Sequence, residues 1–255
     1  MVQPGDKRKF VRSRRGILII GAVFLVVVAI VVAALTRNYW LNGRCGYRLS
    51  QRTIPDLVRK AEQGDANAAR KLQFHYEAES NAEQVIHWLR KAAALGDTDA
   101  QFDLYSDLKN SKDVKLKDEA LRNLLASAEN GNTMAMQDLS DLYFKGGSVR
   151  KDAIEAEKWI RRAALASDPV AMNNLSILIS RRQQDKNSLA EAYAWSRLAA
   201  KRVSPGSVVG KDVQRQCDAI KDGGKAIGIS EAELREEADK REREIESSQK
   251  EKRNR

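Results

Sequence analysis

Small and apolar residues recur every four positions in four segments of the chain. Each series begins at a glycine or a serine and continues four, eight and twelve positions later. Steps of four keep these side chains on one face of an α-helix, so each series predicts a helix that packs into a core. The four series are Gly64, Ala68, Leu72 and Tyr76; Gly96, Ala100, Leu104 and Leu108; Gly131, Ala135, Leu139 and Tyr143; and Ser167, Ala171, Leu175 and Ile179.

These four helices begin at copies of one octamer. The copies fit the pattern A-x-x-[GS]-[DN]-x-x-A, and their starts lie 32, 35 and 36 residues apart. The glycine or serine suits a break between helices, and the Asp or Asn that follows suits the N-cap of the next helix. A recurrence near 35 residues is typical of an array of helical hairpins. The copies are AEQGDANA (61–68), AALGDTDA (93–100), AENGNTMA (128–135) and ALASDPVA (164–171).

A second pattern marks the other helix of each hairpin. VIHWLRKAA, AEKWIRRAA and AYAWSRLAA place Trp88, Trp159 and Trp195 at one equivalent position, whereas Asn123 stands there in the second unit. Small residues follow one turn later, which favours packing between helices over stacking on a ligand. The predicted repeat core consists of Gly64, Leu72, Trp88, Gly96, Leu104, Gly131, Leu139, Trp159, Leu175 and Trp195.

Together the two patterns resemble the SEL-like repeat family, a variable-length relative of the tetratricopeptide repeat. The third unit agrees best, with GGSVRKD at residues 146–152 as the loop between its helices. The glycine that the family places after the leucine is absent, and Gln73, Tyr105, Ser140 and Ser176 stand there instead. Over residues 57–203 the resemblance implies four repeats in an all-α fold, an α/α solenoid of SEL-like helical hairpins with a groove for proteins.

The helix face opposite the apolar stripe is the candidate lining of this groove. Apolar anchors among amides and charges are typical of surfaces that bind other proteins. For Phe74, Phe102 and Ile177, packing against the adjoining helix is the alternative. The candidate groove residues are Arg70, Phe74, Phe102, Gln137, Asp141, Asn173 and Ile177.

The C-terminal part of the chain is predicted to close the array. A terminal repeat needs a polar outer face, and residues 231–255 carry nine acidic and eight basic side chains. Ser230 and Glu233 have the spacing of a capping box at the start of a long charged helix. We therefore expect capping helices over residues 204–247 and a disordered tail over 248–255.

The N-terminal part is predicted to be a membrane anchor. Gly16–Leu35 contains twenty residues without a charge, which as a helix would span the hydrocarbon core of about 30 Å. Six Lys and Arg residues precede this stretch, and the positive-inside rule then places the N-terminus in the cytoplasm. We expect a basic cytoplasmic segment (1–15), a single transmembrane helix (16–36), a linker (37–56) and repeats in the periplasm, in a bacterial inner membrane.

Two alternatives to this anchor concern its processing. Val31-Val32-Ala33 has the small residues of a signal-peptide cleavage site, but the hydrophobic run is longer than the 7–15 residues usual in such peptides. Arg44 before Cys45 does not resemble the cleavage motif of a lipoprotein. An uncleaved anchor is therefore the favoured interpretation.

The charge and the reactive residues exclude other classes of protein. Of the net charge of +10, +6 lies in residues 1–37, so the remainder is a weak field for nucleic acid. His75 and His87 lie twelve positions apart on successive helices, and the sequence contains no G-x-S-x-G, P-loop or H-E-x-x-H motif, so we expect no metal, no cofactor and no catalytic residue. A disulfide between Cys45 and Cys217 would require residues 38–60 to fold back, and free thiols or an intermolecular bond are the alternatives.

These observations predict a non-enzymatic scaffold, tethered to the membrane, that binds an envelope protein in its groove. The family resemblance also permits an immunity protein, which would occlude a toxic phospholipase-type effector of a type VI secretion system. The residues themselves do not separate the two functions.

Overall fold

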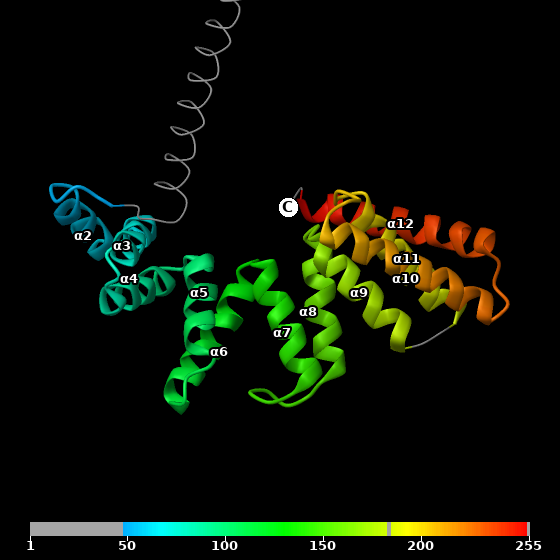
Figure 1. The fold of residues 1–255 in the computed structure, drawn as a ribbon, viewed down its shortest axis with the longest axis horizontal. Helices are drawn as coiled ribbons and strands as arrows, with labels where there is room; N and C mark the ends of the chain where they lie inside the picture. Colours follow the sequence, from blue (N-terminus) through cyan, green and yellow to red (C-terminus); the bar gives the residue numbers. More distant parts are fainter. Residues whose placement is uncertain (1–47, 183–184, 254–255) are drawn as a thin grey trace, which may run out of the picture. The chain divides into compact units, whose positions relative to one another are not determined.

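The computed structural model describes residues 48–182 and 185–253 of the 255-residue chain, and the regular elements of that part are α-helices (Figure 1). The predicted cytoplasmic segment, the transmembrane helix and most of the linker lie outside the described residues. Within the described residues no helix is long and apolar enough to cross a membrane. The helices are α2 (Ile54–Glu62), α3 (Ala66–Ala78), α4 (Ala82–Ala94), α5 (Thr98–Leu108), α6 (Val114–Glu129), α7 (Thr133–Lys145), α8 (Ala153–Leu165), α9 (Pro169–Arg182), α10 (Lys186–Ala200), α11 (Val208–Ala226) and α12 (Glu231–Arg253).

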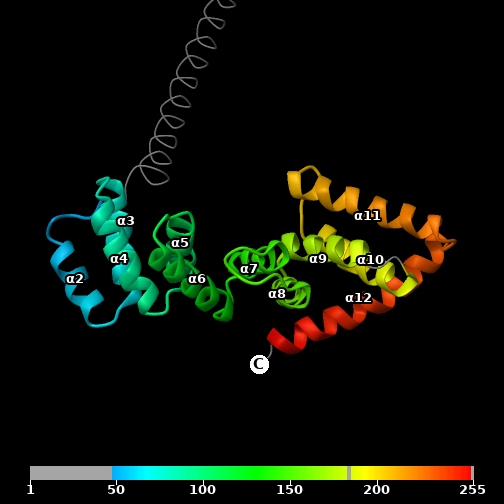
Figure 2. The same cartoon turned by 90° about the horizontal axis from the view of Figure 1, so that it is seen from below.

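The helices belong to two compact units. Among the described residues, one unit comprises Arg48–Gln63 together with Ala68–Trp88, and the other comprises Gly64–Asn67 together with the described chain from Leu89 onward. In the second unit consecutive helices pack as hairpins, α5 on α6, α7 on α8 and α9 on α10, and each hairpin also packs on the next (Figure 2). The expected all-α solenoid of helical hairpins is therefore confirmed.

The octamer copies form the joints between hairpins. Gly64, Gly96 and Gly131 have φ angles of +100°, +88° and +103°, in the left-handed region that ends helices, and Ser167 takes the same role at +72°. The next residue caps the following helix, since the Asp97 carboxylate accepts a hydrogen bond from the Ala100 N–H at 2.7 Å. The equivalent bonds run from Ala135 N–H to Asn132 at 3.0 Å and from Ala171 N–H to Asp168 at 2.9 Å.

The same joints are hydrogen-bonded to one another across successive repeats. The Asn132 amide donates to the Asp99 carboxylate at 3.1 Å. One repeat later, the Thr133 hydroxyl donates to the Asp168 carboxylate at 2.8 Å. The capping residues therefore also fix the register between neighbouring hairpins.

The leucines and tryptophans that recur in the sequence are buried. Leu72, Leu139 and Leu175 are fully buried, and Leu104 is 2% exposed. Among the tryptophans, Trp195 is the most enclosed at 1% exposure, because α10 is covered by α9, α11 and α12. The other two tryptophans in the described part of the chain, Trp88 and Trp159, are also buried.

The C-terminal helices differ from the expectation in length. The capping box of α12 is formed, with the Glu233 N–H donating to the Ser230 hydroxyl at 3.2 Å and the Ser230 N–H donating to the Glu233 carboxylate at 3.0 Å. However, α12 continues to Arg253, so the prediction of disorder from residue 248 is wrong for residues 248–253. The buried Gln249 amide donates to the Ala164 carbonyl of α8 at 3.1 Å, and this distant partner orders the end of the helix.

Candidate protein-interaction groove

The second unit has a groove between α7, α8 and α9 with a volume of about 610 Å³. Its floor is apolar, with Ile160 buried and Ile177 and Leu178 half-buried. At its edge Phe144 is 51% exposed, which is unusual for a large aromatic side chain. The lining residues are Gln137, Asp138, Ser140, Asp141 and Phe144 from α7; Ala153, Glu157 and Ile160 from α8; and Asn174, Ile177, Leu178, Arg181 and Arg182 from α9.

The loop between α7 and α8 shapes one end of the groove. Gly146 and Gly147 have φ angles of +80° and +114°, which only glycine adopts readily, so the chain turns sharply after α7. The Asp152 N–H then donates to the Tyr143 carbonyl at 2.9 Å and closes the loop. As a result Lys151 lies over the Phe144 ring, with 5.8 Å between Nζ and the ring centroid.

The two walls of the groove carry opposite charges. The α7 wall is acidic, and Asp141 is paired with Lys145 at 2.6 Å and Asp138 with Lys109 at 3.7 Å. Between the walls, the Glu157 carboxylate of α8 accepts from Arg161 at 2.8 Å and also from Arg182.

The α9 wall is basic and carries Arg181 and Arg182. The two walls also touch through amides, since Asn174 donates to Gln137 at 3.4 Å.

A buried tyrosine lies behind the acidic wall. Burial, together with the carboxylates of Asp138 and Asp141, raises the pKa of Tyr105 to about 12. The Lys109 ammonium lies 4.9 Å from the centroid of the same ring. Tyr105 is therefore neutral at physiological pH, and it links α5 to the α7 wall.

The sequence-predicted groove residues are divided between the two units, and three of them line the groove described here. Gln137, Asp141 and Ile177 line the groove described here. Phe102 is half-buried on α5 and packs near Tyr105, with 6.0 Å between ring centroids. Arg70 and Phe74 belong to the first unit, where the Arg70 guanidinium lies 4.7 Å from the Phe74 ring centroid.

The structure corrects the prediction that Asn173 lines the groove. Asn173 is buried and does not line the groove, and its neighbour Asn174 lines it instead. The reason is that α11 packs against α9, where the Gln216 amide donates to the Ser180 hydroxyl at 3.1 Å and to the Ser176 hydroxyl at 3.4 Å. The open face of α9 is thereby rotated by about one residue, about 100° around the helix.

Sequence reasoning also missed lining residues next to the predicted positions on α7 and α9. Leu178 and Arg181 extend the face of Asn174 by four and seven positions, a spacing that keeps all three side chains together. Asp138 is the equivalent position on α7. For α9 the sequence did contain an indication of this. A capping helix was predicted after the fourth repeat, and such a helix must pack on one face of α9.

The two histidines and the described cysteine lie in different surroundings. His75 is buried and its Nδ1 accepts from the Leu49 N–H at 3.2 Å, whereas His87 is exposed beside Trp88. Within the described ranges, no group of three or more His, Cys, Asp or Glu residues could hold a metal ion. Cys45 lies outside the described residues.

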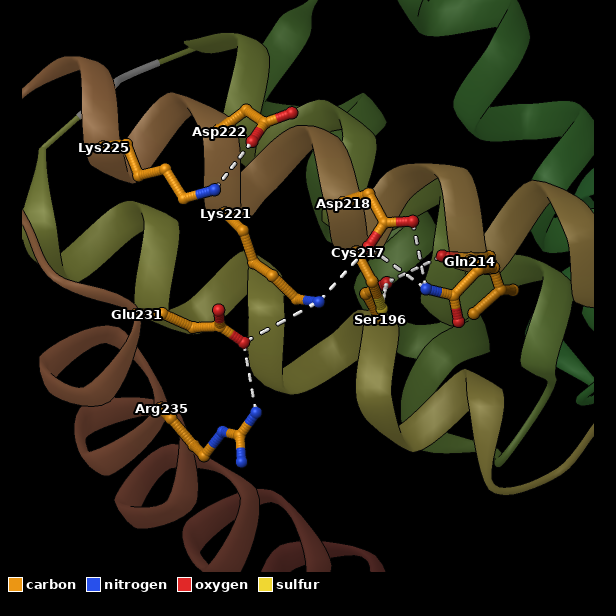
Figure 3. A network of polar contacts seen from close by, with 10 residues as sticks. Ser196, Gln214, Cys217, Asp218, Lys221, Asp222, Lys225, Glu231 and Arg235 are labelled. Carbon is orange, nitrogen blue, oxygen red and sulfur yellow. Dashed lines mark hydrogen bonds and ion pairs between the residues drawn. The ribbon is translucent and has the colours of Figure 1, made fainter.

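Cys217 belongs to the packing between the C-terminal helices. Its sulfur lies 2.8 Å from the Ser196 hydroxyl, and burial raises the pKa of the thiol (Figure 3). On the same helix Lys221 pairs with Asp218 at 3.2 Å and with Glu231 of α12 at 3.8 Å. These contacts hold α10, α11 and α12 together.

Comparison with known proteins identifies Sel1 repeats in part of the chain. Residues 78–97, 133–168 and 169–203 match the Sel1 repeat. The match leaves out residues 98–132, the unit in which Asn123 takes the place of the tryptophan. No curated protein matches the chain.

Two solved structures are similar to this chain. One is a protective antigen of uropathogenic Escherichia coli strains that displays an SLR fold, with 20% identity, a TM-score of 0.60 and coverage of 83% of this chain and 44% of that one. The other is a Sel1 repeat protein from Oxalobacter formigenes, with 30% identity, a TM-score of 0.42 and coverage of 51% of this chain and 95% of that one. The chain thus spans less than half the length of the first relative. The chain therefore carries Sel1 repeats at residues 78–97 and 133–203, and its all-α fold is similar to the SLR fold.

Proposed function

We propose that the protein is a membrane-tethered periplasmic scaffold that holds a protein partner in the groove between α7, α8 and α9. The observation that carries the proposal is this groove, which lies within two Sel1 repeats and combines an apolar floor with charged walls. Sel1 repeats generally mediate contacts between proteins, and a half-exposed aromatic residue such as Phe144 is a typical anchor for a partner. The uncharged stretch Gly16–Leu35 supports the tether.

The tether would also change how strong the binding needs to be. A partner in the same membrane or in the periplasm next to it meets the groove at a raised effective concentration. A groove with a few apolar anchors and modest intrinsic affinity is then sufficient for a stable assembly.

We expect a photo-crosslinking amino acid at position 144, in the full-length protein in cells, to capture a partner protein. The same amino acid at Val208, which is 78% exposed on α11, is the matched control and is expected to capture none. Phe144→Asp is expected to weaken binding of the identified partner at least about 30-fold, because a charge replaces an anchor worth about 2 kcal/mol.

Equal capture from positions 144 and 208, or an unchanged dissociation constant for Phe144→Asp, would contradict the groove assignment. The partner's identity also separates the two functional alternatives. An envelope protein agrees with a scaffold, whereas a phospholipase-type effector would replace it with the immunity function.

The tether makes a separate prediction about topology. A reporter that is active only in the periplasm should be active when it is fused after Arg255, and the protein should sediment with the membranes. Deletion of residues 16–36 should leave the protein in the cytoplasm with a silent reporter. A silent reporter on the stable full-length fusion would overturn the orientation, and a full-length protein recovered in the soluble periplasmic fraction would overturn the tether.

A further inference from the structure

We infer that the occupant of the groove is a short acidic and apolar segment of a partner protein, which places a carboxylate on Arg181 beside an apolar side chain on Ile177 and Phe144. The inference rests on the proposed function and specifies the chemistry of its partner. It follows from the charges at the groove and from which of them are already paired.

The anions of the groove are already matched by cations of this chain. Glu157 is paired with both Arg161 and Arg182, and Asp141 is paired with Lys145. Asp138 lies 3.7 Å from Lys109. A cationic segment would therefore have to compete with an existing ion pair at each of these carboxylates.

Two cations at the groove, unlike Arg182, are not matched in this way. Arg181 is exposed and makes no ion pair with any residue that the structure describes, and the same holds for Lys151 over the Phe144 ring. Arg181 lies in the last turn of α9, where a cation is favoured by the helix dipole, but that interaction uses none of its hydrogen-bond donors. An acidic partner would pair with Arg181 and Lys151 without breaking an existing ion pair.

The guanidinium of Arg181 also lies close to the apolar part of the groove. A partner segment can therefore bind Arg181 through an acidic residue and the groove through an apolar residue nearby. Arg181 follows Ile177 by four positions on α9, so the two side chains share one face of the helix. Phe144 faces the same groove from α7. Arginine can bind a carboxylate through two parallel hydrogen bonds, which makes this position selective for Asp or Glu.

Selection of a displayed library of random twelve-residue peptides on the full-length protein in detergent tests this inference. The enriched peptides are expected to carry Asp or Glu within about four positions of an aromatic or aliphatic residue, the reach of one helical turn. For an enriched synthetic peptide, Asp→Asn in the peptide should weaken binding about tenfold, the loss of one charged hydrogen-bonded pair.

The charge-swap variant Arg181→Glu should weaken binding of the acidic peptide by at least the same factor and should select basic peptides instead. The matched control is Arg215→Glu, on the exposed face of α11 outside the groove, which should retain the preference of the wild type. In the Arg181→Gln variant the Asp→Asn change in the peptide should have little further effect, because the two changes remove the same interaction.

The possible failures are distinct. Enriched peptides that lose binding on Phe144→Asp but show no acidic preference would overturn this inference and leave the proposed function standing. Enriched peptides that bind equally to the wild type, Phe144→Asp and Arg181→Glu would overturn the groove itself, and the inference with it.

Discussion

Replacing Trp195 by alanine is expected to lower the free energy of unfolding by about 3–5 kcal/mol. The side chain is 1% exposed on α10, and α10 packs against α9, α11 and α12, so the vacated volume lies at the junction of four helices. The surrounding helices cannot move far enough to fill such an enclosed cavity. The loss of stability is therefore expected near the upper end of this range. The loss should appear in chemical denaturation followed by circular dichroism.

Two variants separate this packing effect from other causes. The indole Nε1 of Trp195 has no hydrogen-bond partner among the described residues, so Trp195→Phe should lose only volume and cost about 1–2 kcal/mol. Val208→Ala, at a side chain that is 78% exposed, should stay within about 0.5 kcal/mol of the wild type. A Trp195→Ala protein as stable as Val208→Ala would show that α10 is not the centre of the C-terminal packing.

Replacing Arg197 by methionine is expected to loosen α12 and to lower the free energy of unfolding by about 2–3 kcal/mol. The guanidinium on α10 pairs with Asp239 at 2.5 Å and with Glu242 at 3.2 Å on α12. Glu242 is 6% exposed, so its carboxylate would stay buried with Lys201 as its remaining cation, 3.1 Å away. Asp239 and Lys201 are more exposed than Glu242. We therefore expect a smaller loss of unfolding free energy than the roughly 3–5 kcal/mol typical of breaking a fully buried pair.

Hydrogen exchange along α12 provides the measurement for this second prediction, since local opening of the helix speeds the exchange of its amides. The double variant Arg197→Met with Glu242→Leu should recover most of the stability, because no unpaired charge remains buried. Lys240→Met, at an exposed ion pair within α12, should leave the exchange rates unchanged. Exchange in Arg197→Met that equals exchange in Lys240→Met would refute the role of this network.

The fold could be predicted from the sequence because the joints are encoded locally. A left-handed glycine or serine followed by a capping Asp or Asn specifies a helix end and a helix start within two residues, and four copies give the period. The alternation of Leu on one helix with Trp on the next then identifies the buried faces. None of this depends on contacts between distant parts of the chain.

The groove and the end of α12 could be predicted only in part because they depend on such contacts. Whether Asn173 or Asn174 faces the groove is decided by α11, which covers one side of α9. The order of residues 248–253 is decided by the hydrogen bond from Gln249 to Ala164, 85 positions away in the sequence. A helical repeat pattern shows which residues of a helix share one face. It does not show how that face is turned when two neighbouring helices pack against the helix.

The return of α12 along α10 has a practical consequence for labelling. The bond between Gln249 and Ala164 brings the end of α12 to α8, the helix that also supplies Glu157 and Ile160 to the groove (Figure 2). A fluorophore attached near the end of α12 would therefore stand beside the third repeat and not beyond the last hairpin. Such a probe would work as a proximity sensor, whose emission changes when a partner docks on the third repeat.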